Sequence, residues 1–272
     1  MATRVMGVLN VTPDSFSDGG RWTDPQAAVA HGLAMVAEGA DIIDVGGEST
    51  RPGAEPVEEV EERRRVVPVV AALAPHVRVS VDTRKAAVAE AAVEEGATLV
   101  NDVSASLWPV VAAAAGEVGW VAMHMQGEPA TMQADPRYDD VVAEVRVFLE
   151  HRADAARTAG VDEVWIDPGI GFGKTLDHNL TLLARLEDLV ATGLPVLVGA
   201  SRKGFLGALM GGAPAADRLE GSLAVAVWAA TAGVAMVRVH DVAATVDALR
   251  LVGPPGPAPG LSGSGPVVES RS

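Results

Sequence analysis

The chain has 272 residues, of which 49% are hydrophobic and only 4% aromatic, so it can form the core of one large α/β domain, filled mainly by Ala, Val and Leu. A formal net charge of -15 argues against a general nucleic-acid-binding protein, and the absence of cysteine excludes disulfides, a thiolate nucleophile and a Cys-based zinc site. No apolar run reaches about 18 residues without Gly or charge, so no membrane contact is predicted, and the N-terminal residues show no secretory pattern, which favours a cytoplasmic protein.

Helix-like stretches that end in Gly, each followed by a short apolar strand, recur along the chain. Gly after a helix supplies the left-handed residue that ends it, and a continuously apolar strand is typical of a parallel sheet covered on both faces. The predicted strands are, in chain order, 5–9, 39–44, 77–81, 96–101, 120–123, 160–167, 195–198 and 233–238. The predicted helices between and after them are 25–38, 56–74, 84–95, 108–117, 139–159, 178–191, 216–232 and 242–252.

Eight βα units in about 250 residues are the count and size of a (β/α)₈ TIM barrel. The alternative is a doubly wound open sheet, which usually carries a Gly-rich phosphate loop after its first strand, and no G-x-G-x-x-G follows residues 5–9. We therefore predict a single α/β domain over residues 1–252. Residues 253–272 are rich in Pro, Gly and Ser and are predicted to be a disordered tail.

Each predicted strand ends at, or just before, a polar residue. In a barrel these ends converge on one rim, which is where active sites of this fold lie. A single Asp or Asn at such a place usually caps a helix or forms a turn, but His and Arg are poor caps, so eight polar ends together indicate a polar site. The residues are Asn10, Asp44, Asp82, Asn101, His124, Asp167, the run Ser201-Arg202-Lys203, and Arg238 with His240.

The rim residues fall into two chemical groups. Asp82, Asn101 and Asp167 can pair with the amino and ring N–H groups of a flat heterocycle with an aminopyrimidine edge. Arg238 and His240, with Asn10 and the run 201–203, suit phosphate oxygens or a carboxylate. Asn10 also offers a neutral oxygen that can ligate Mg²⁺.

Eight motifs in order along residues 5–252 resemble bacterial dihydropteroate synthase, a pterin-binding TIM-barrel family. The two long motifs, NVTPDSFSDGG at 10–20 and DVGGESTRPG at 44–53, are highly specific. The others are SVDT at 80–83, ND at 101–102, MHMQG at 123–127, DPGIGFG at 167–173, SRK at 201–203 and RVH at 238–240.

The resemblance implies an Mg²⁺-dependent transferase that joins 6-hydroxymethyl-7,8-dihydropterin diphosphate to p-aminobenzoate and releases pyrophosphate, in an enzyme that is usually a homodimer. By position it implies that the pterin contacts Asp82, Asn101, Asp167 and Lys203, that pyrophosphate lies near Arg238 and His240, and that Mg²⁺ lies at Asn10. It implies a p-aminobenzoate pocket built by the loops 14–18 and 49–53, and the implied pocket residues are Phe16, Thr50, Arg51, Pro52 and Ser201. The implied catalytic residues are Asp82, Lys203, Asp18 and Arg51.

Two other functions remain as alternatives. A corrinoid-type pterin methyltransferase shares the barrel and the pterin half, but is expected to lack the motifs at 50–52 and 201–203. A catalytically silent barrel is expected to have lost residues such as Asn10, Asp82 or Lys203, and all of these are present. His124 is expected to support the rim, while Lys174, after the Gly-rich turn, is a weak candidate for a phosphate contact.

Overall fold

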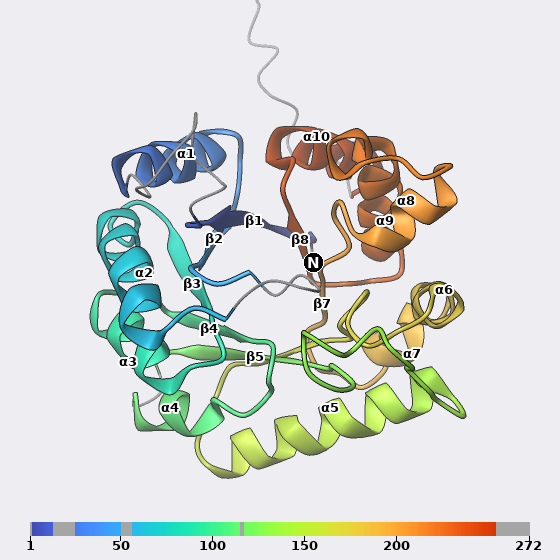
Figure 1. Cartoon of the computed structure of the whole chain (residues 1–272), viewed down its shortest axis with the longest axis horizontal. Helices are drawn as coiled ribbons and strands as arrows, with labels where there is room; N and C mark the ends of the chain where they lie inside the picture. Colours follow the sequence, from blue (N-terminus) through green and yellow to red (C-terminus); the bar gives the residue numbers. More distant parts are fainter. Residues whose placement is uncertain (1, 13–24, 50–55, 115–116, 254–272) are drawn as a thin grey trace, which may run out of the picture.

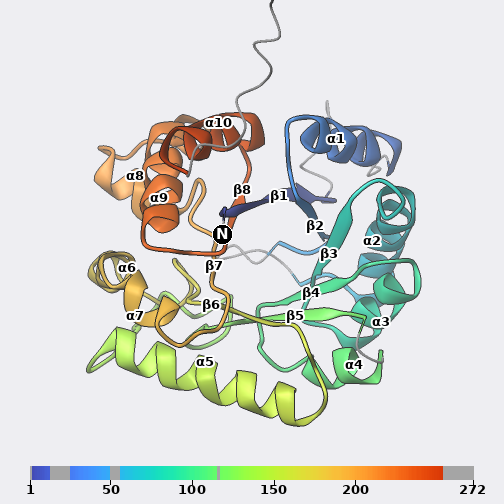
Figure 2. The same ribbon diagram turned by 180° about the vertical axis from the view of Figure 1, so that it is seen from behind.

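The computed structural model describes residues 2–12, 25–49, 56–114 and 117–253. In this part of the chain eight parallel strands form one sheet in the order β6-β5-β4-β3-β2-β1-β8-β7. An isolated parallel bridge between Ile166 and Val196 joins the two edges and closes the sheet into a barrel. Helices surround the strands on all sides (Figures 1 and 2), which confirms the predicted (β/α)₈ barrel.

The strands lie close to their predicted positions. Their bounds are β1 Arg4–Asn10, β2 Ile42–Gly46, β3 Arg78–Asp82, β4 Leu99–Asp102, β5 Gly119–Met123, β6 Val164–Asp167, β7 Leu197–Val198 and β8 Met236–Val239. β7 is short because Pro195 has no N–H for the ladder, although its carbonyl accepts a hydrogen bond from the Ile166 N–H at 3.0 Å.

The helices cover the outside of the barrel. Their bounds are α1 Pro25–Ala37, α2 Glu59–Leu73, α3 Ala86–Glu94, α4 Trp108–Ala113, α5 Val141–Thr158, α6 Leu176–Ala184, α7 Leu186–Val190, α8 Gly204–Leu209, α9 Leu219–Thr231 and α10 Val242–Val252, with a 3-10 turn at Ala215–Asp217. No helix in the described ranges is both long enough and apolar enough to span a bilayer.

Two helix predictions were wrong in detail. The stretch 178–191 is not one helix, because Arg185 leaves the helical conformation (φ -118°, ψ 31°) and divides it into α6 and α7. The helix α8 was not predicted, because its six residues, GFLGAL, are too few to show a helical period. The predicted tail lies outside the described residues, apart from Gly253.

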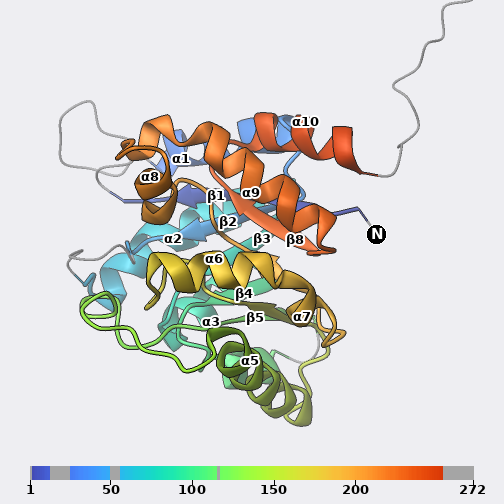
Figure 3. The same cartoon turned by 90° about the vertical axis from the view of Figure 1, so that its right-hand side faces the viewer.

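The barrel interior is filled by one buried apolar residue from each of seven strands, which we call the apolar layer. Its members are Met6, Ile42, Leu99, Val121, Trp165, Leu197 and Met236. A larger, separate cluster packs the helices against the outside of the strands. The apolar layer closes the barrel below the rim, while the N-terminus lies at one end of the barrel axis (Figure 3).

Candidate active site

The candidate site is built by the inward positions that follow the apolar layer, and we call these positions the polar layer. Since side chains alternate along a strand, the second residue after each apolar-layer residue also points into the barrel. The polar layer therefore contains Asp44, Asn101, Asp167 and Arg238, two residues after Ile42, Leu99, Trp165 and Met236 respectively. We also count Asp82, which is paired with Asn101 in the register of β3 and β4, and Lys203, whose ammonium contacts the turn after β6. A period of two thus places charged and amide groups directly above a hydrophobic floor.

Arg238 is the centre of the polar layer. Its Nε donates to Asp44 Oδ2 at 2.5 Å, and its Nη2 donates to Asp82 Oδ2 at 2.6 Å. Asn101 Nδ2 donates to the same Asp44 oxygen at 2.9 Å, and Asp44 is fully buried. One guanidinium thus joins strands β2, β3 and β8. Arg238, which was expected in the phosphate half, lies among the carboxylates of the other half.

Asp167 and Lys203 lie beside this arginine. Asp167 is 5% exposed, and its Oδ1 accepts a hydrogen bond from the Gly169 N–H at 2.7 Å. Lys203 donates from Nζ to the Ile170 carbonyl and lies 4.4 Å from the ring centroid of Phe172. The turn after β6 therefore holds the ammonium of Lys203, which comes from the loop after β7.

The glycines of this turn allow the loops after β5 and β6 to approach closely. Gly169 has φ +65°, and a Cβ there would lie 1.9 Å from the His124 carbonyl oxygen. Gly173 has φ +56°, and a Cβ there would lie 2.3 Å from the Gln126 carbonyl oxygen. Only glycine fits these two positions, which explains the spacing of the DPGIGFG motif.

Burial perturbs the charged groups of the polar layer. It raises the pKa of Asp82 to about 7, although the nearby Arg238 opposes the shift. Burial also raises the pKa of Asp167 and lowers the pKa of Lys203 to about 8, against the opposing effect of Asp167. Burial would lower the pKa of Arg238, but the surrounding carboxylates raise it above the ordinary value. Groups perturbed by both burial and specific partners are typical of functional sites.

The Ser201-Arg202-Lys203 run is a fixed turn that separates its two cations. Arg202 has a positive φ of 59°, which is uncommon for a residue other than glycine, and its Nε pairs with Asp241 Oδ2 at 3.0 Å. Arg202 thus pairs outside the polar layer, whereas Lys203 reaches the turn after β6. Ser201 Oγ lies 3.1 Å from His240 Nδ1, so these two predicted site residues are brought together.

His124 and Lys174 form a buried support behind the site. Lys174 is 2% exposed, and its Nζ lies 3.0 Å from His124 Nδ1 and 3.0 Å from the Phe172 carbonyl oxygen. Burial, together with the charge of Lys174, lowers the pKa of His124 to about 3, and burial lowers the pKa of Lys174 to about 7. The structure agrees with the expected supporting role of His124. The phosphate contact considered for Lys174 was wrong, because its ammonium is enclosed by protein groups.

Asn10 ends β1 at the rim, partly buried, with Gly46 opposite it in the register. Among the described residues no cluster of three His, Cys, Asp or Glu side chains could hold a metal ion. Five residues predicted for the site lie outside the described residues. They are Phe16, Asp18, Thr50, Arg51 and Pro52.

Two residues contribute in ways that the sequence did not indicate. Phe172 packs against Lys203. Asp44 was predicted as a polar strand end without an assigned partner, and it pairs with Arg238 from inside β2, two residues before the strand ends. A further group around Lys85 joins the ends of β2 and β3 through long-range ion pairs. The position of Asp44 could have been found by counting every second residue along β2, whereas nothing in the local pattern signals the Lys85 contacts.

Comparison with known proteins shows which family the chain belongs to. Residues 6–240 match the family described as pterin binding enzyme. The chain is 53% identical over 264 residues to a Mycobacterium leprae protein named dihydropteroate synthase, with 92% of each chain covered.

Two solved structures from Xanthomonas albilineans are also similar, each over 92% of both chains. One is dihydropteroate synthase with 4-aminobenzoic acid, at 50% identity and a TM-score of 0.85. The other is dihydropteroate synthase in complex with 7,8-dihydropteroate, at 48% identity and a TM-score of 0.82.

Proposed function

Since the chain belongs to the dihydropteroate synthases of the pterin-binding enzyme family, we propose that its polar layer binds the pterin ring during the reaction of that family. This reaction condenses 6-hydroxymethyl-7,8-dihydropterin diphosphate with p-aminobenzoate to give 7,8-dihydropteroate and pyrophosphate. The observation that carries the proposal is the set of buried Asn101 and Asp167 and partly buried Asp82 and Lys203, which is gathered around Arg238 above the apolar layer.

The pterin is proposed to bind through its aminopyrimidine edge. Carboxylates at Asp82 and Asp167 accept from amino and ring N–H groups, while Asn101 and Lys203 can donate to a ring carbonyl or nitrogen. As pyrophosphate departs, positive charge develops on the pterin, and fixed carboxylates in a site of low dielectric stabilise it. The aniline nitrogen of p-aminobenzoate is already a nucleophile, so the chain needs to supply no strong base.

The leaving group is proposed to lie at the rim above the pterin. Arg238 and His240 come from β8 and the loop that follows it, and Ser201 lies against His240. The imidazole of His240 and the hydroxyl of Ser201 suit diphosphate oxygens, and Arg238, although paired with Asp44 and Asp82, is proposed to add positive charge near them. Phe16, Thr50, Arg51, Pro52 and Ser201 are proposed for p-aminobenzoate, and Asp18 and Arg51 for catalysis, on the strength of the family motifs alone.

Asn10 fits the proposed Mg²⁺ in its chemistry. A single neutral amide oxygen at the rim agrees with the way Mg²⁺ binds to nucleotide and phosphate substrates, where one or two protein oxygens are joined by phosphate oxygens and water. When bound, Mg²⁺ would neutralise charge on the departing pyrophosphate.

The turnover assay tests the function itself. Full-length protein mixed with the pterin diphosphate, p-aminobenzoate and Mg²⁺ should release pyrophosphate and form 7,8-dihydropteroate in equal amounts. Methyl transfer from a methylated pterin to a corrinoid protein, or no turnover at all, would contradict the proposal. We further propose that the protein is a cytoplasmic homodimer, and sedimentation equilibrium tests the dimer.

Pterin binding is expected to strengthen as the pH rises. The pKa of Asp82 in the free protein is raised by burial to about 7, and N–H donors of the pterin favour its ionised form. The pKa should therefore be lower in the complex, so binding releases a proton below pH 7. We expect affinity for 6-hydroxymethyl-7,8-dihydropterin to be about tenfold weaker at pH 6 than at pH 8.

Isothermal titration calorimetry in buffers of different ionisation enthalpy measures both the affinity and the proton release. The Asp82→Asn variant is the control, and its weaker binding should lose this pH dependence. If the wild-type affinity were the same at pH 6 and pH 8, pterin binding would not depend on ionisation of Asp82.

A further inference from the structure

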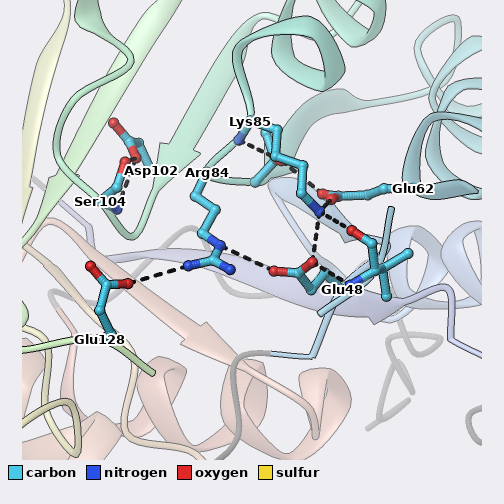
Figure 4. Close-up of polar contacts among 9 residues, drawn as sticks. Glu48, Glu62, Arg84, Lys85, Asp102, Ser104 and Glu128 are labelled. Carbon is cyan, nitrogen blue, oxygen red and sulfur yellow. Dashed lines mark hydrogen bonds and ion pairs between the residues drawn. The ribbon is translucent and has the colours of Figure 1, made fainter. Parts of the chain in front are cut away.

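A group of charged side chains, which we call the Lys85 cluster, lies where β2 and β3 end, and the mechanism above does not use it. Its charged members are Glu48, Glu62, Arg84 and Lys85 (Figure 4), and Thr83 joins it through a hydrogen bond to Glu62. Glu48 follows β2, Glu62 lies in α2, and the other three follow Asp82 of β3. The cluster is thus adjacent in sequence to a proposed pterin ligand.

The ammonium of Lys85 contacts Glu48 and Val57, which lie nine residues apart in the sequence. Its Nζ lies 2.6 Å from Glu48 Oε2 and donates to the Val57 carbonyl oxygen at 2.7 Å. Glu48 Oε2 in turn accepts from the Val57 N–H at 2.8 Å. Residues 48 and 57 flank the TRP motif at 50–52, so one cation fixes the two positions between which that motif lies in the sequence.

The same ammonium is connected to the pterin side of the barrel. Lys85 Nζ also pairs with Glu62 Oε2, while Glu62 Oε1 accepts from Thr83 Oγ1 at 2.7 Å. Thr83 follows Asp82 directly, and its N–H donates to the Asn101 carbonyl oxygen at 3.2 Å. Hydrogen bonds therefore run without a gap from Val57 to the strand ends that carry Asp82 and Asn101.

The ion-pairing side chains of the Lys85 cluster are largely buried, which restricts the positions they can take. The side chains of Glu62 and Glu48 are only 1% and 9% exposed, and that of Lys85 is 19% exposed. Burial would raise the pKa of Glu48, but hydrogen bonds from Lys85 and the Val57 N–H lower it below the ordinary value. Burial would lower the pKa of Lys85, but Glu48 and Glu62 raise it. Glu48 and Lys85 are thus held in the charged form.

The backbone at the end of β2 packs tightly against α2 beside the Lys85 cluster. A Cβ on Gly47 would lie 2.8 Å from Val66 Cγ2 and 3.0 Å from Glu62 Cγ, so the chain leaves the strand in close contact with α2. Arg65 Nη1 also donates to the Gly47 carbonyl oxygen at 3.0 Å. Loss of the Lys85 contacts with Glu48 and Val57 is therefore transmitted to the position of Glu48 rather than absorbed locally.

We propose that Lys85 is a positioning residue for the p-aminobenzoate step, because it fixes Glu48 and Val57 relative to each other and to Asp82. This rests on the proposed function, which assigns Thr50 and Arg51 to p-aminobenzoate. A brace needed only for folding would affect both substrates equally. A positioning role affects p-aminobenzoate selectively, since Lys85 contacts Glu48 and Val57 directly but is connected to Asp82 and Asn101 through Glu62 and Thr83. Asp82 and Asn101 are in addition held by the pairing of β3 with β4.

The test is steady-state kinetics of Lys85→Met alongside the wild type, with pterin binding measured by calorimetry. We expect the KM for p-aminobenzoate to rise at least about tenfold, because small misplacements of a binding group cost this much or more. The Kd for 6-hydroxymethyl-7,8-dihydropterin should stay within about twofold of the wild type. Arg84→Met is the matched control, because Arg84 contacts Glu48 and Glu128 but neither backbone group of Val57, and its KM should change by less than about twofold.

A second variant covers the case in which Lys85→Met fails to fold with two buried carboxylates left without their cation. Lys85→Met/Glu62→Gln removes one charge of each sign and leaves Glu48 paired with Arg84. The proposal predicts the same selective rise in KM for this variant. An unchanged KM for p-aminobenzoate, or an equal loss for both substrates, would overturn it. Absence of turnover in the wild type would instead refute the proposed function.

Discussion

Replacing Lys203 with alanine is expected to lower kcat/KM for the pterin substrate by at least about 30-fold, which corresponds to about 2 kcal/mol and lies within the roughly 1.5–3 kcal/mol of a hydrogen bond from a charged group. Among the described residues, Lys203 is the cation of the polar layer without a direct ion pair to a carboxylate, and its ammonium contacts the Ile170 carbonyl and the ring of Phe172. It is therefore the group best placed to exchange a protein contact for a pterin acceptor. Steady-state kinetics with pterin diphosphate as the varied substrate measures the effect.

The fold should survive the Lys203→Ala change, because Lys203 comes from a loop and precedes the short helix α8. Arg250→Ala serves as the control, since Arg250 is 73% exposed and, among the described residues, forms an ion pair only with the similarly exposed Asp247. Its kcat/KM should be that of the wild type. A Lys203→Ala enzyme with near-normal kcat/KM and an unchanged thermal transition would show that the pterin binds elsewhere.

Replacing Arg238 with methionine is expected to cost about 3–5 kcal/mol of unfolding free energy at neutral pH, as is usual when one partner of a buried ion pair is removed. Arg238 is the cation hydrogen-bonded to both Asp44 and Asp82, and without it the fully buried Asp44 keeps the Asn101 amide as its partner. Urea unfolding followed by circular dichroism measures the loss.

Two variants make this stability measurement specific. Arg238→Met/Asp44→Asn removes the buried carboxylate together with its cation and should recover a large part of the lost stability. Arg250→Met, in an exposed pair, should change stability by less than about 0.5 kcal/mol. An unfolding free energy of Arg238→Met close to that of the wild type would mean that the Asp44–Arg238–Asp82 bridge does not hold the three strands together.

The sequence was sufficient to predict the barrel because its signals are local and repeated. Each strand is a short apolar run, and Gly39, Gly96, Gly160 and Gly233 follow four of the helices. Errors were therefore confined to the ends of elements, to the short helix α8 and to the break at Arg185. The same repetition predicted that Asp82, Asn101, Asp167 and Arg238 would meet, since parallel strands deliver their ends to one rim.

Contacts between residues distant in sequence could not be predicted in this way. Arg238 was expected to face phosphate, and its pairing with Asp44 depends on the direction in which β2 turns that side chain, two residues before the strand ends at Gly46. The ion pair of Lys85 with Glu62 joins residues 23 apart, and no periodicity encodes it. These contacts depend on how strands and helices pack, which the residue pattern constrains only in part.

A crystal structure of the protein with bound 6-hydroxymethyl-7,8-dihydropterin diphosphate is the most direct test of the central claim, that the polar layer is the pterin site. The account predicts that the pterin ring lies over the apolar layer, with its aminopyrimidine edge within hydrogen-bond distance of Asp82, Asn101 and Asp167, and with Lys203 turned from the Ile170 carbonyl towards the ring. A pterin bound outside the barrel rim, with the Arg238 ion pairs and the Lys203 contacts unchanged, would contradict it.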